Sequence, residues 1–168
     1  MHLPLAQKLA EKILAEISPY CLKAEIAGSI RRRRPFVNDI DLVLLPRDGN
    51  LLALQERFHK SCKVLKEGQQ NAMYELANGF QLDVFFAYQK EALFTPMTTN
   101  WGTLLLCRTG SKEHNIYLIE QAKKINRAWR PYAGVFDLDT GDCLACATEE
   151  SIFEALGLPF IPPQSRER

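Results

Sequence analysis

The sequence has no long apolar run, no signal-peptide pattern and no low-complexity segment. Its apolar stretches fall short of the ~18 residues that a membrane-spanning helix requires, which excludes insertion into a membrane. The composition, 46% hydrophobic and 24% charged, excludes disordered and fibrous proteins and is typical of a globular chain. With 168 residues, the chain has room for one medium domain or two small units.

Paired metal-binding motifs are also scarce. Cys143 and Cys146 are spaced as a CxxC pair, but no second pair and no paired histidines complete a zinc site, so we interpret both as strand thiols. The five cysteines are an odd number in a chain without a secretory pattern. Free thiols and a cytoplasmic location are therefore expected.

Charge of one sign is not in large excess, because the formal net charge is only +1. The basic residues are nevertheless unevenly distributed. Arg31 to Arg34 form an unbroken run, and six basic residues against two acidic ones lie between Arg108 and Arg130. Each patch alone is typical of a solvated surface, whereas a nucleic-acid partner would use both.

Apolar periodicity separates helical from extended segments. Four-residue spacing predicts an amphipathic helix from Leu5 to Ile17, ending before Pro19. Asn78-Gly79 is a hairpin signal, and the hydroxyls of Thr109-Gly110-Ser111 can cap a following helix. Further helices are expected at 51–58, 112–125 and 148–156, and strands at 23–27, 40–45, around 64, 73–76, 80–86, 135–138 and 143–147. We expect an α+β chain, with a mixed sheet covered by helices and a boundary near residue 105.

Three aspartates lie in or beside apolar strands. Asp39 and Asp41 are two positions apart in an extended segment, so their side chains point to the same face. Carboxylates this close repel each other unless a cation lies between them, and such hard oxygen ligands suit Mg²⁺. Asp83 stands in another apolar strand, where a lone charge is costly unless it too faces a metal. The pattern predicts a metal site formed by these three carboxylates.

A glycine turn precedes the acidic pair. Gly28-Ser29 lets the backbone approach a phosphate closely, and its N–H groups, its hydroxyl and a nearby arginine can hold a triphosphate. Two metal ions about 3.5 to 4 Å apart can activate an attacking hydroxyl and stabilise a leaving pyrophosphate. Each feature alone is more typical of a solvated turn, but their order along the chain favours phosphoryl transfer.

In this combination the sequence resembles the X family of DNA polymerases, over nearly the whole chain. The motifs that carry the resemblance are Gly28-Ser29-Ile30-Arg31-Arg32, Asp39-Ile40-Asp41, Asp83, and Thr109-Gly110-Ser111 with Asn115 after it. The resemblance implies a nucleotidyltransferase palm at 1–105 and a small α/β thumb at 106–168. It covers palm and thumb only, as in the shortest viral members of the family, and residues 150–163 resemble the end of the thumb in bacterial members.

The resemblance also implies a role for each matching residue. Asp39 and Asp41 would bind two Mg²⁺ ions, with Mn²⁺ as a possible substitute, and Asp83 would help to activate the primer 3′ hydroxyl. The residues expected to bind nucleotide are Gly28, Ser29, Arg32, Thr109, Gly110 and Asn115. Those expected to lie along DNA phosphates are Lys112, Lys123, Lys124 and Arg127.

The implied activity is the addition of deoxynucleotides from dNTP to the 3′ hydroxyl of gapped or primer-template DNA, for short-gap repair, by a monomer without a membrane partner. Cys107-Arg108, Phe85 and Ile119 depart from the family pattern, which leaves sugar preference and template dependence open. A second hypothesis keeps the chemistry but changes the acceptor to RNA, protein or a small molecule, or makes transfer independent of a template. A third is a non-catalytic DNA-binding subunit, which three costly carboxylates disfavour.

Overall fold

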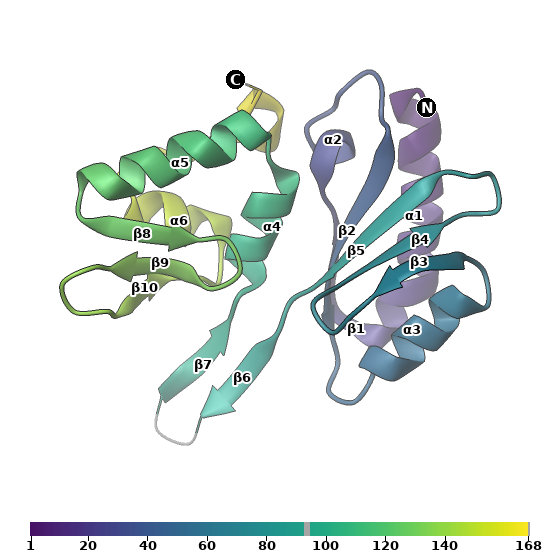
Figure 1. Ribbon diagram of the computed structural model, residues 1–168, viewed down its shortest axis with the longest axis horizontal. Coiled ribbons are helices and arrows are strands. Elements are labelled where there is room, and N and C mark those ends of the chain that lie inside the picture. The colour runs from purple at the N-terminus through teal and green to yellow at the C-terminus, as the bar shows by residue number, and fades with distance from the viewer. Residues whose placement is uncertain (93–94, 168) are drawn as a thin grey trace. The chain divides into compact units, whose positions relative to one another are not determined.

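The computed structural model describes residues 1–92 and 95–167, with the backbone alone for 91, 92 and 95–98. Two units divide the chain, Met1–Ala87 and Tyr88–Arg168, and each has a hydrophobic core of its own (Figure 1). Among the described residues, no helix has the length and apolar character to cross a membrane.

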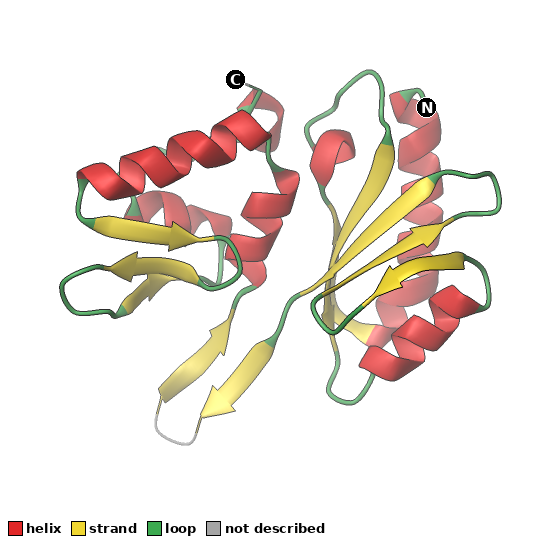
Figure 2. Ribbon diagram, in the orientation of Figure 1, coloured by secondary structure: helices red, strands yellow, loops and turns green. Residues whose placement is uncertain are grey.

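The first unit is built on a five-stranded mixed sheet (Figure 2). Its strands are β1 (Cys21–Ile26), β2 (Asp39–Pro46), β3 (Lys63–Glu67), β4 (Asn71–Glu75) and β5 (Gln81–Phe86), in the order β1-β2-β5-β4-β3. The central pair, β2 and β5, is parallel, whereas every other pair in this sheet is antiparallel. The predicted α+β class with a mixed sheet is therefore confirmed.

Two helices, α1 (Leu3–Ile17) and α3 (Leu51–His59), bury their apolar sides against one face of this sheet. Ile40, Leu42 and Leu44 alternate along β2 toward that core, and Leu82 and Val84 do so along β5. Because successive strand residues point to opposite faces, the odd-numbered positions of β2 and β5 lie on the other side of the sheet. A four-residue helix, α2 (Gly28–Arg31), and a 3-10 turn, η1 (Ser18–Tyr20), complete the unit.

The outer strands β1 and β3 carry charged residues and interrupted pairing. All five residues of β3 are exposed, and its register with β4 shifts between Val64 and Lys66. The register of β1 with β2 shifts between Cys21 and Lys23. Both edges of the sheet are therefore irregular where their strands face solvent.

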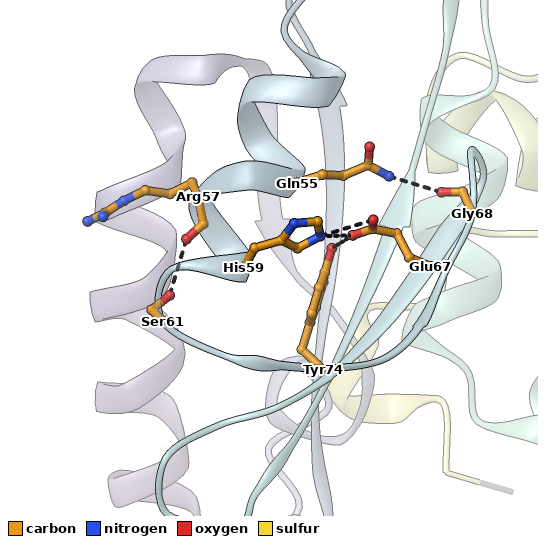
Figure 3. Close-up of polar contacts among 7 residues, drawn as sticks. All are labelled: Gln55, Arg57, His59, Ser61, Glu67, Gly68 and Tyr74. Atoms are coloured by element: carbon orange, nitrogen blue, oxygen red, sulfur yellow. Dashed lines mark hydrogen bonds and ion pairs between the residues drawn. The ribbon is translucent and has the colours of Figure 1, made fainter.

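A polar cluster joins α3 to the β3–β4 hairpin (Figure 3). Glu67 accepts a hydrogen bond of 2.7 Å from the Tyr74 hydroxyl, and its two carboxylate oxygens lie 2.8 and 3.0 Å from His59 Nε2. Burial alone would raise the pKa of Glu67, but the bonds from Tyr74 and His59 outweigh it and lower that pKa. Burial, and then the Glu67 carboxylate, raise the pKa of Tyr74.

The second unit combines three helices with two small sheets. The helices are α4 (Trp101–Thr109), α5 (Lys112–Lys124) and α6 (Glu149–Ala155), with a 3-10 turn η2 (Pro163–Ser165). Strands β8 (Arg127–Arg130), β9 (Gly134–Asp137) and β10 (Cys143–Ala145) form an antiparallel sheet in the order β10-β9-β8, and β6 (Gln89–Ala92) pairs with β7 (Thr95–Thr99). Leu106, Leu118, Trp129, Val135 and Phe153 belong to its core.

Close backbone packing makes α4 part of this second unit. A Cβ added to Gly102 would lie 2.3 Å from the backbone nitrogen of Thr148, so glycine alone fits there without displacement. Trp129 donates a 2.8 Å hydrogen bond to the buried Thr103 hydroxyl, which places it in the core. The structural division after Ala87 therefore precedes the boundary expected near residue 105, which falls inside α4.

A buried ion pair connects the end of the chain to the start of α6 and α5. Arg166 is fully buried, and its Nη1 donates a 2.6 Å hydrogen bond to Glu149 Oε1. Its Nε donates to the Ile161 carbonyl at 2.8 Å, and its own carbonyl accepts a 2.8 Å bond from the Ser111 hydroxyl. The guanidinium lies 5.5 Å from the ring centroids of Phe153 and Phe160.

Several elements differ from those expected. The apolar stretch before Thr109 is the helix α4, and Gly28-Ser29 begins the short helix α2 instead of a simple turn. Strands β6, β7 and β8 have no counterpart among the expected strands. For β8, the reason is that apolar and polar residues alternate only weakly over Arg127–Arg130, which lies within a basic segment. The expected strands and helices of the first unit occur within a few residues of their expected bounds.

Substituting Tyr74 with Phe tests the polar cluster. We expect a loss of about 1 kcal/mol in the free energy of unfolding at neutral pH, at the low end for a bond to a charged group because Glu67 is partly exposed. A carboxylate whose pKa is lowered by folding stabilises the protein above its unfolded pKa and loses this contribution as pH falls. The difference between the Phe variant and wild type should therefore shrink in urea denaturation at acid pH.

The buried ion pair yields a second prediction. Arg166→Met should lower the free energy of unfolding by about 3 to 5 kcal/mol, because Glu149 is left buried without its partner. In the double variant with Glu149→Leu, urea denaturation should recover much of this loss. Equal losses in the single and double variants would show that packing of the Arg166 stem, and not the charge of Glu149, sets the cost.

Candidate functional site

Two neighbouring strands bring the three predicted aspartates onto one side of the sheet. In the parallel pairing of β2 with β5, Asp41 lies opposite Asp83, and Asp39 lies opposite Gln81. Side chains of directly paired residues point to the same face, and Asp39 and Asp41 share that face because they are two positions apart. The backbone therefore places Asp39, Asp41 and Asp83 on one face of the sheet, and their role as metal ligands stays a prediction.

Burial alternates along both strands in the same sense. Asp39, Asp41 and Asp83 are half-buried, whereas Ile40 and Leu82 beside them are fully buried. The aspartates thus lie on the face opposite α1 and α3, where their charges are spared the full cost of transfer into the core. A carboxylate in this position can bind a ligand from solvent and still be fixed by its strand.

The turn before α2 lies directly against one of these carboxylates. A Cβ built on Gly28 would stand 1.8 Å from Asp41 Oδ2, so a residue with a side chain does not fit there without displacing Asp41. Gly28 also has a φ of 57°, a region that glycine enters at little cost. A 2.8 Å bond from the Ala27 amide to the Asp41 carbonyl holds the turn on β2.

Ser29 and Arg32 follow this turn. The Ser29 hydroxyl oxygen is buried and finds no hydrogen-bond partner within the described part of the chain. The Arg32 amide bonds the Gly28 carbonyl at 3.2 Å, which closes the single turn of α2. An orphaned hydroxyl beside a close glycine and a half-buried arginine is chemically suited to an anionic ligand.

Gln81 is a member of the site that the motifs did not reveal. Its Nε2 donates a 2.7 Å hydrogen bond to Asp83 Oδ1, and this bond orients the carboxylate. The available signal was its position two residues before Asp83 in the same strand, which puts both side chains on one face. Within residues 1–92 and 95–167, no group of three His, Cys, Asp or Glu side chains is arranged so that it could hold a metal ion.

The donor set nevertheless fits Mg²⁺ or Mn²⁺ in its chemistry. Three aspartates on one face supply only hard oxygen ligands, which these cations prefer. Gly28 leaves room for the Asp41 carboxylate, and the Gln81 bond is a contact that Asp83 can exchange for a stronger ligand.

The predicted nucleotide-binding residues of the second unit surround the α4–α5 junction. Thr109 is the last residue of α4 and is buried, and Gly110 follows with a φ of 68° and a cis peptide bond to Ser111. Ser111 caps α5 by accepting a 3.2 Å hydrogen bond from the His114 amide, as expected. Asn115 Nδ2 donates 2.9 Å to the Cys107 carbonyl, and its buried Oδ1 has no hydrogen-bond partner among the described residues.

The predicted phosphate-binding residues are not equivalent. Lys112, Lys123 and Lys124 are exposed on α5, and Lys124 donates to Gln121 Oε1 at 3.3 Å. Arg127 is half-buried and donates through Nη1 to the carbonyl of Ala155. The three lysines are therefore available at the surface, whereas Arg127 has a structural contact within its own unit.

The chain shares sequence and fold with known polymerases. Residues 104–167 match the family described as DNA polymerase beta thumb. The chain is 30% identical over 167 residues to the DNA polymerase/3′-5′ exonuclease PolX of Bacillus subtilis. That alignment covers 96% of this chain but only 28% of the Bacillus protein, so the chain spans a little over a quarter of this relative.

Two crystal structures of Leishmania infantum polymerase beta share the fold over all of this chain. The ternary P/T complex matches with a TM-score of 0.76 and 17% identity over 77% of its own chain. The ternary gap complex matches with a TM-score of 0.74 and 16% identity over 71% of its own chain.

The chain has an α+β fold like that of polymerase beta. The sequence relationship over nearly the whole chain, the thumb match and the shared fold all support the resemblance to family X of the DNA polymerases that the motifs predict.

Gly28→Ala tests the contact between the turn and Asp41, with Gly79→Ala as its matched control. Both glycines have positive φ angles, 57° and 76°, but nothing lies within 4 Å of a Cβ added to Gly79. We expect Gly28→Ala to lower the free energy of unfolding by about 1 to 3 kcal/mol more than Gly79→Ala, because overpacking adds to backbone strain. If thermal denaturation shows equal losses of stability in the two variants, Gly28 is required only for its backbone conformation and not for its contact with Asp41.

Proposed function

We propose that this chain adds deoxynucleotides to a DNA 3′ hydroxyl, with release of pyrophosphate, and that short gaps are its substrates. The resemblance to family X makes a DNA polymerase-like activity the coarser expectation, and the acidic face of the sheet supports this specific reaction. Relatives with the same fold are polymerases, one of them in a ternary gap complex. A monomeric, cytoplasmic protein and a palm at 1–105 with a thumb at 106–168 remain part of the proposal.

The observation that carries the proposal is the register of β2 with β5. Asp41 stands opposite Asp83, and Asp39 is two positions away, so three half-buried carboxylates share one face of the sheet, where cations would relieve their repulsion. A module that only bound DNA would gain nothing from this cluster, because carboxylates repel phosphate. The cluster therefore favours an enzyme over a binding subunit.

Asp39 and Asp41 would hold two divalent cations, and Asp83 would share one of them. When bound, such ions lower the pKa of the attacking hydroxyl and neutralise charge on the phosphates. Asp83 would accept the proton of the 3′ hydroxyl, and Gln81 donates a hydrogen bond to one of its carboxylate oxygens. Gly28 keeps the Asp41 carboxylate close to the turn.

The same proposal assigns the anionic end of the nucleotide to the turn of the first unit. Gly28 permits close approach of a phosphate, the Ser29 hydroxyl can donate to it, and Arg32 supplies charge. These groups lie beside Asp41, so a triphosphate and its cations would be bound by one continuous set of residues.

In the second unit, we assign Thr109, Gly110 and Asn115 to the sugar and base of the nucleotide. The buried Asn115 Oδ1 offers an acceptor, and Gly110 presents backbone without a side chain. Lys112, Lys123 and Lys124 would lie along DNA phosphates and position the duplex without reading its sequence. Affinity for DNA should then fall as salt is raised.

Primer extension on a one-nucleotide-gapped duplex tests the proposal. Asp83→Ala should lower the extension rate by a factor on the order of 100 or more, because the proton acceptor and a cation ligand are lost together. Chelation of divalent cations by EDTA should abolish extension by the wild-type chain.

Asp48→Ala is the control, since Asp48 is exposed in the loop after β2 and far along that strand from the cluster. It should extend primers at the wild-type rate. Extension that survives Asp83→Ala would remove Asp83 from the reaction. Transfer to RNA, or in the absence of a template, as fast as to gapped DNA would replace the proposed acceptor.

A further inference from the structure

Figure 1 shows the loop between α2 and β2. This loop carries an exposed aromatic ring that the proposed reaction does not use. Phe36 is 65% exposed, although phenylalanine side chains are usually buried. It follows directly on Arg33, Arg34 and Pro35, all of which are exposed. An aromatic ring beside a basic run differs from an ordinary solvated charge run, which has no reason to keep a phenylalanine in water.

The backbone holds Phe36 firmly on both sides. The Leu3 amide bonds the Pro35 carbonyl at 3.1 Å, and the Val37 amide bonds the Met1 carbonyl at 2.9 Å. These bonds flank an antiparallel bridge between His2 and Phe36. Val37, the next residue, is fully buried and anchors the loop in the core.

The ring itself is supported on one side. The His2 ring lies 4.7 Å from the Phe36 ring, centroid to centroid, at an interplanar angle of 44°. A ring that is already fixed by its backbone and a neighbour loses little conformational freedom when a flat ligand stacks on its open side. The geometry is that of a stacking platform.

The backbone of the two arginines before Phe36 is also held by local hydrogen bonds. The Arg33 amide bonds the Ile30 carbonyl and the Arg34 amide bonds the Ser29 carbonyl, each at 2.9 Å. Arg33 adopts a φ of 60°, which is uncommon for a residue with a side chain and turns the chain back toward β2. The loop thus combines a held ring with nearby positive charge.

We propose that Phe36, with Arg33 and Arg34, binds an unpaired nucleotide of single-stranded DNA. Bases stack on aromatic side chains without sequence preference, while basic residues bind the neighbouring phosphates. Paired bases in a duplex present no free face to such a platform. The choice of DNA rests on the proposed function, whereas the requirement for an unpaired base follows from the loop.

Fluorescence anisotropy with a short labelled oligothymidylate and a blunt duplex tests this surface, in EDTA and without nucleotide. Phe36→Ala should bind the single strand at least about 5-fold more weakly and leave duplex affinity unchanged. Phe36→Trp should bind at least as tightly as wild type, and Phe36→Leu as weakly as Phe36→Ala. Because Phe36 is exposed, these variants should keep the wild-type thermal denaturation midpoint.

Leu52→Ala is the matched control, because Leu52 is a 72% exposed apolar residue on α3 and should leave both affinities unchanged. Arg33→Gln should reduce the salt dependence of single-strand binding by about 0.7 in the slope of log affinity against log salt, the value for one phosphate contact.

Wild-type affinity in Phe36→Ala, or in Phe36→Leu, would overturn the stacking role. Tighter binding of a single-stranded RNA than of DNA would overturn the choice of DNA. The measurement requires neither metal nor nucleotide, so its outcome is separate from that of primer extension. A chain that binds single strands through Phe36 yet extends no primer would support this inference and contradict the proposed reaction alone.

Discussion

The parallel pairing of β2 with β5 is the constraint on which the acidic face depends. A slip of one residue would reverse the faces of every side chain in the shifted strand. Ile40, Leu42, Leu82 and Val84 oppose such a slip, since each buried aliphatic side chain stabilises the fold by roughly 1.5 to 3 kcal/mol. The hydrophobic core on one side of the sheet thereby places the carboxylates on the other.

The second unit relies on a different kind of constraint, a charged pair in a dry environment. Arg166 and Glu149 are both almost completely buried, and besides its bond to Glu149 the arginine side chain donates to the Ile161 carbonyl. Its carbonyl also fixes the Ser111 hydroxyl at the start of α5. The junction between α4 and α5, where the candidate nucleotide residues lie, is thus supported by a residue at the far end of the sequence.

Local pattern was enough to predict most of the first unit. Alternation in β2 and β5, the four-residue spacing of α1 and the Asn78-Gly79 hairpin are all properties of short segments. The three aspartates could be grouped because two share a strand, and the third was assigned from the cost of a charge among apolar residues. Parallel pairing of their strands, by contrast, depends on the chain between them and has no local signal.

The remaining features were hidden for related reasons. Arg166 lies after several prolines, and no periodicity indicates that its side chain returns to Glu149. The sequence shows that Phe36 is apolar but does not predict that it is exposed, because its position depends on pairing with the distant His2 segment. Strands β6, β7 and β8 are short; β6 pairs with β7, and β8 pairs with β9. Contacts between distant segments carry this information.

The irregular outer strands of the five-stranded sheet bear on how this protein behaves at high concentration. An exposed edge strand can recruit an identical strand from another molecule and so start aggregation. In β3, Lys63, Lys66 and Glu67 place charged side chains on this edge, and the shifted register interrupts the row of bonding groups. At the opposite edge, β1 combines Lys23 and Glu25 with a shift of its own. Continuous intermolecular sheets are therefore disfavoured at both ends, although Val64 and Leu65 are open to water.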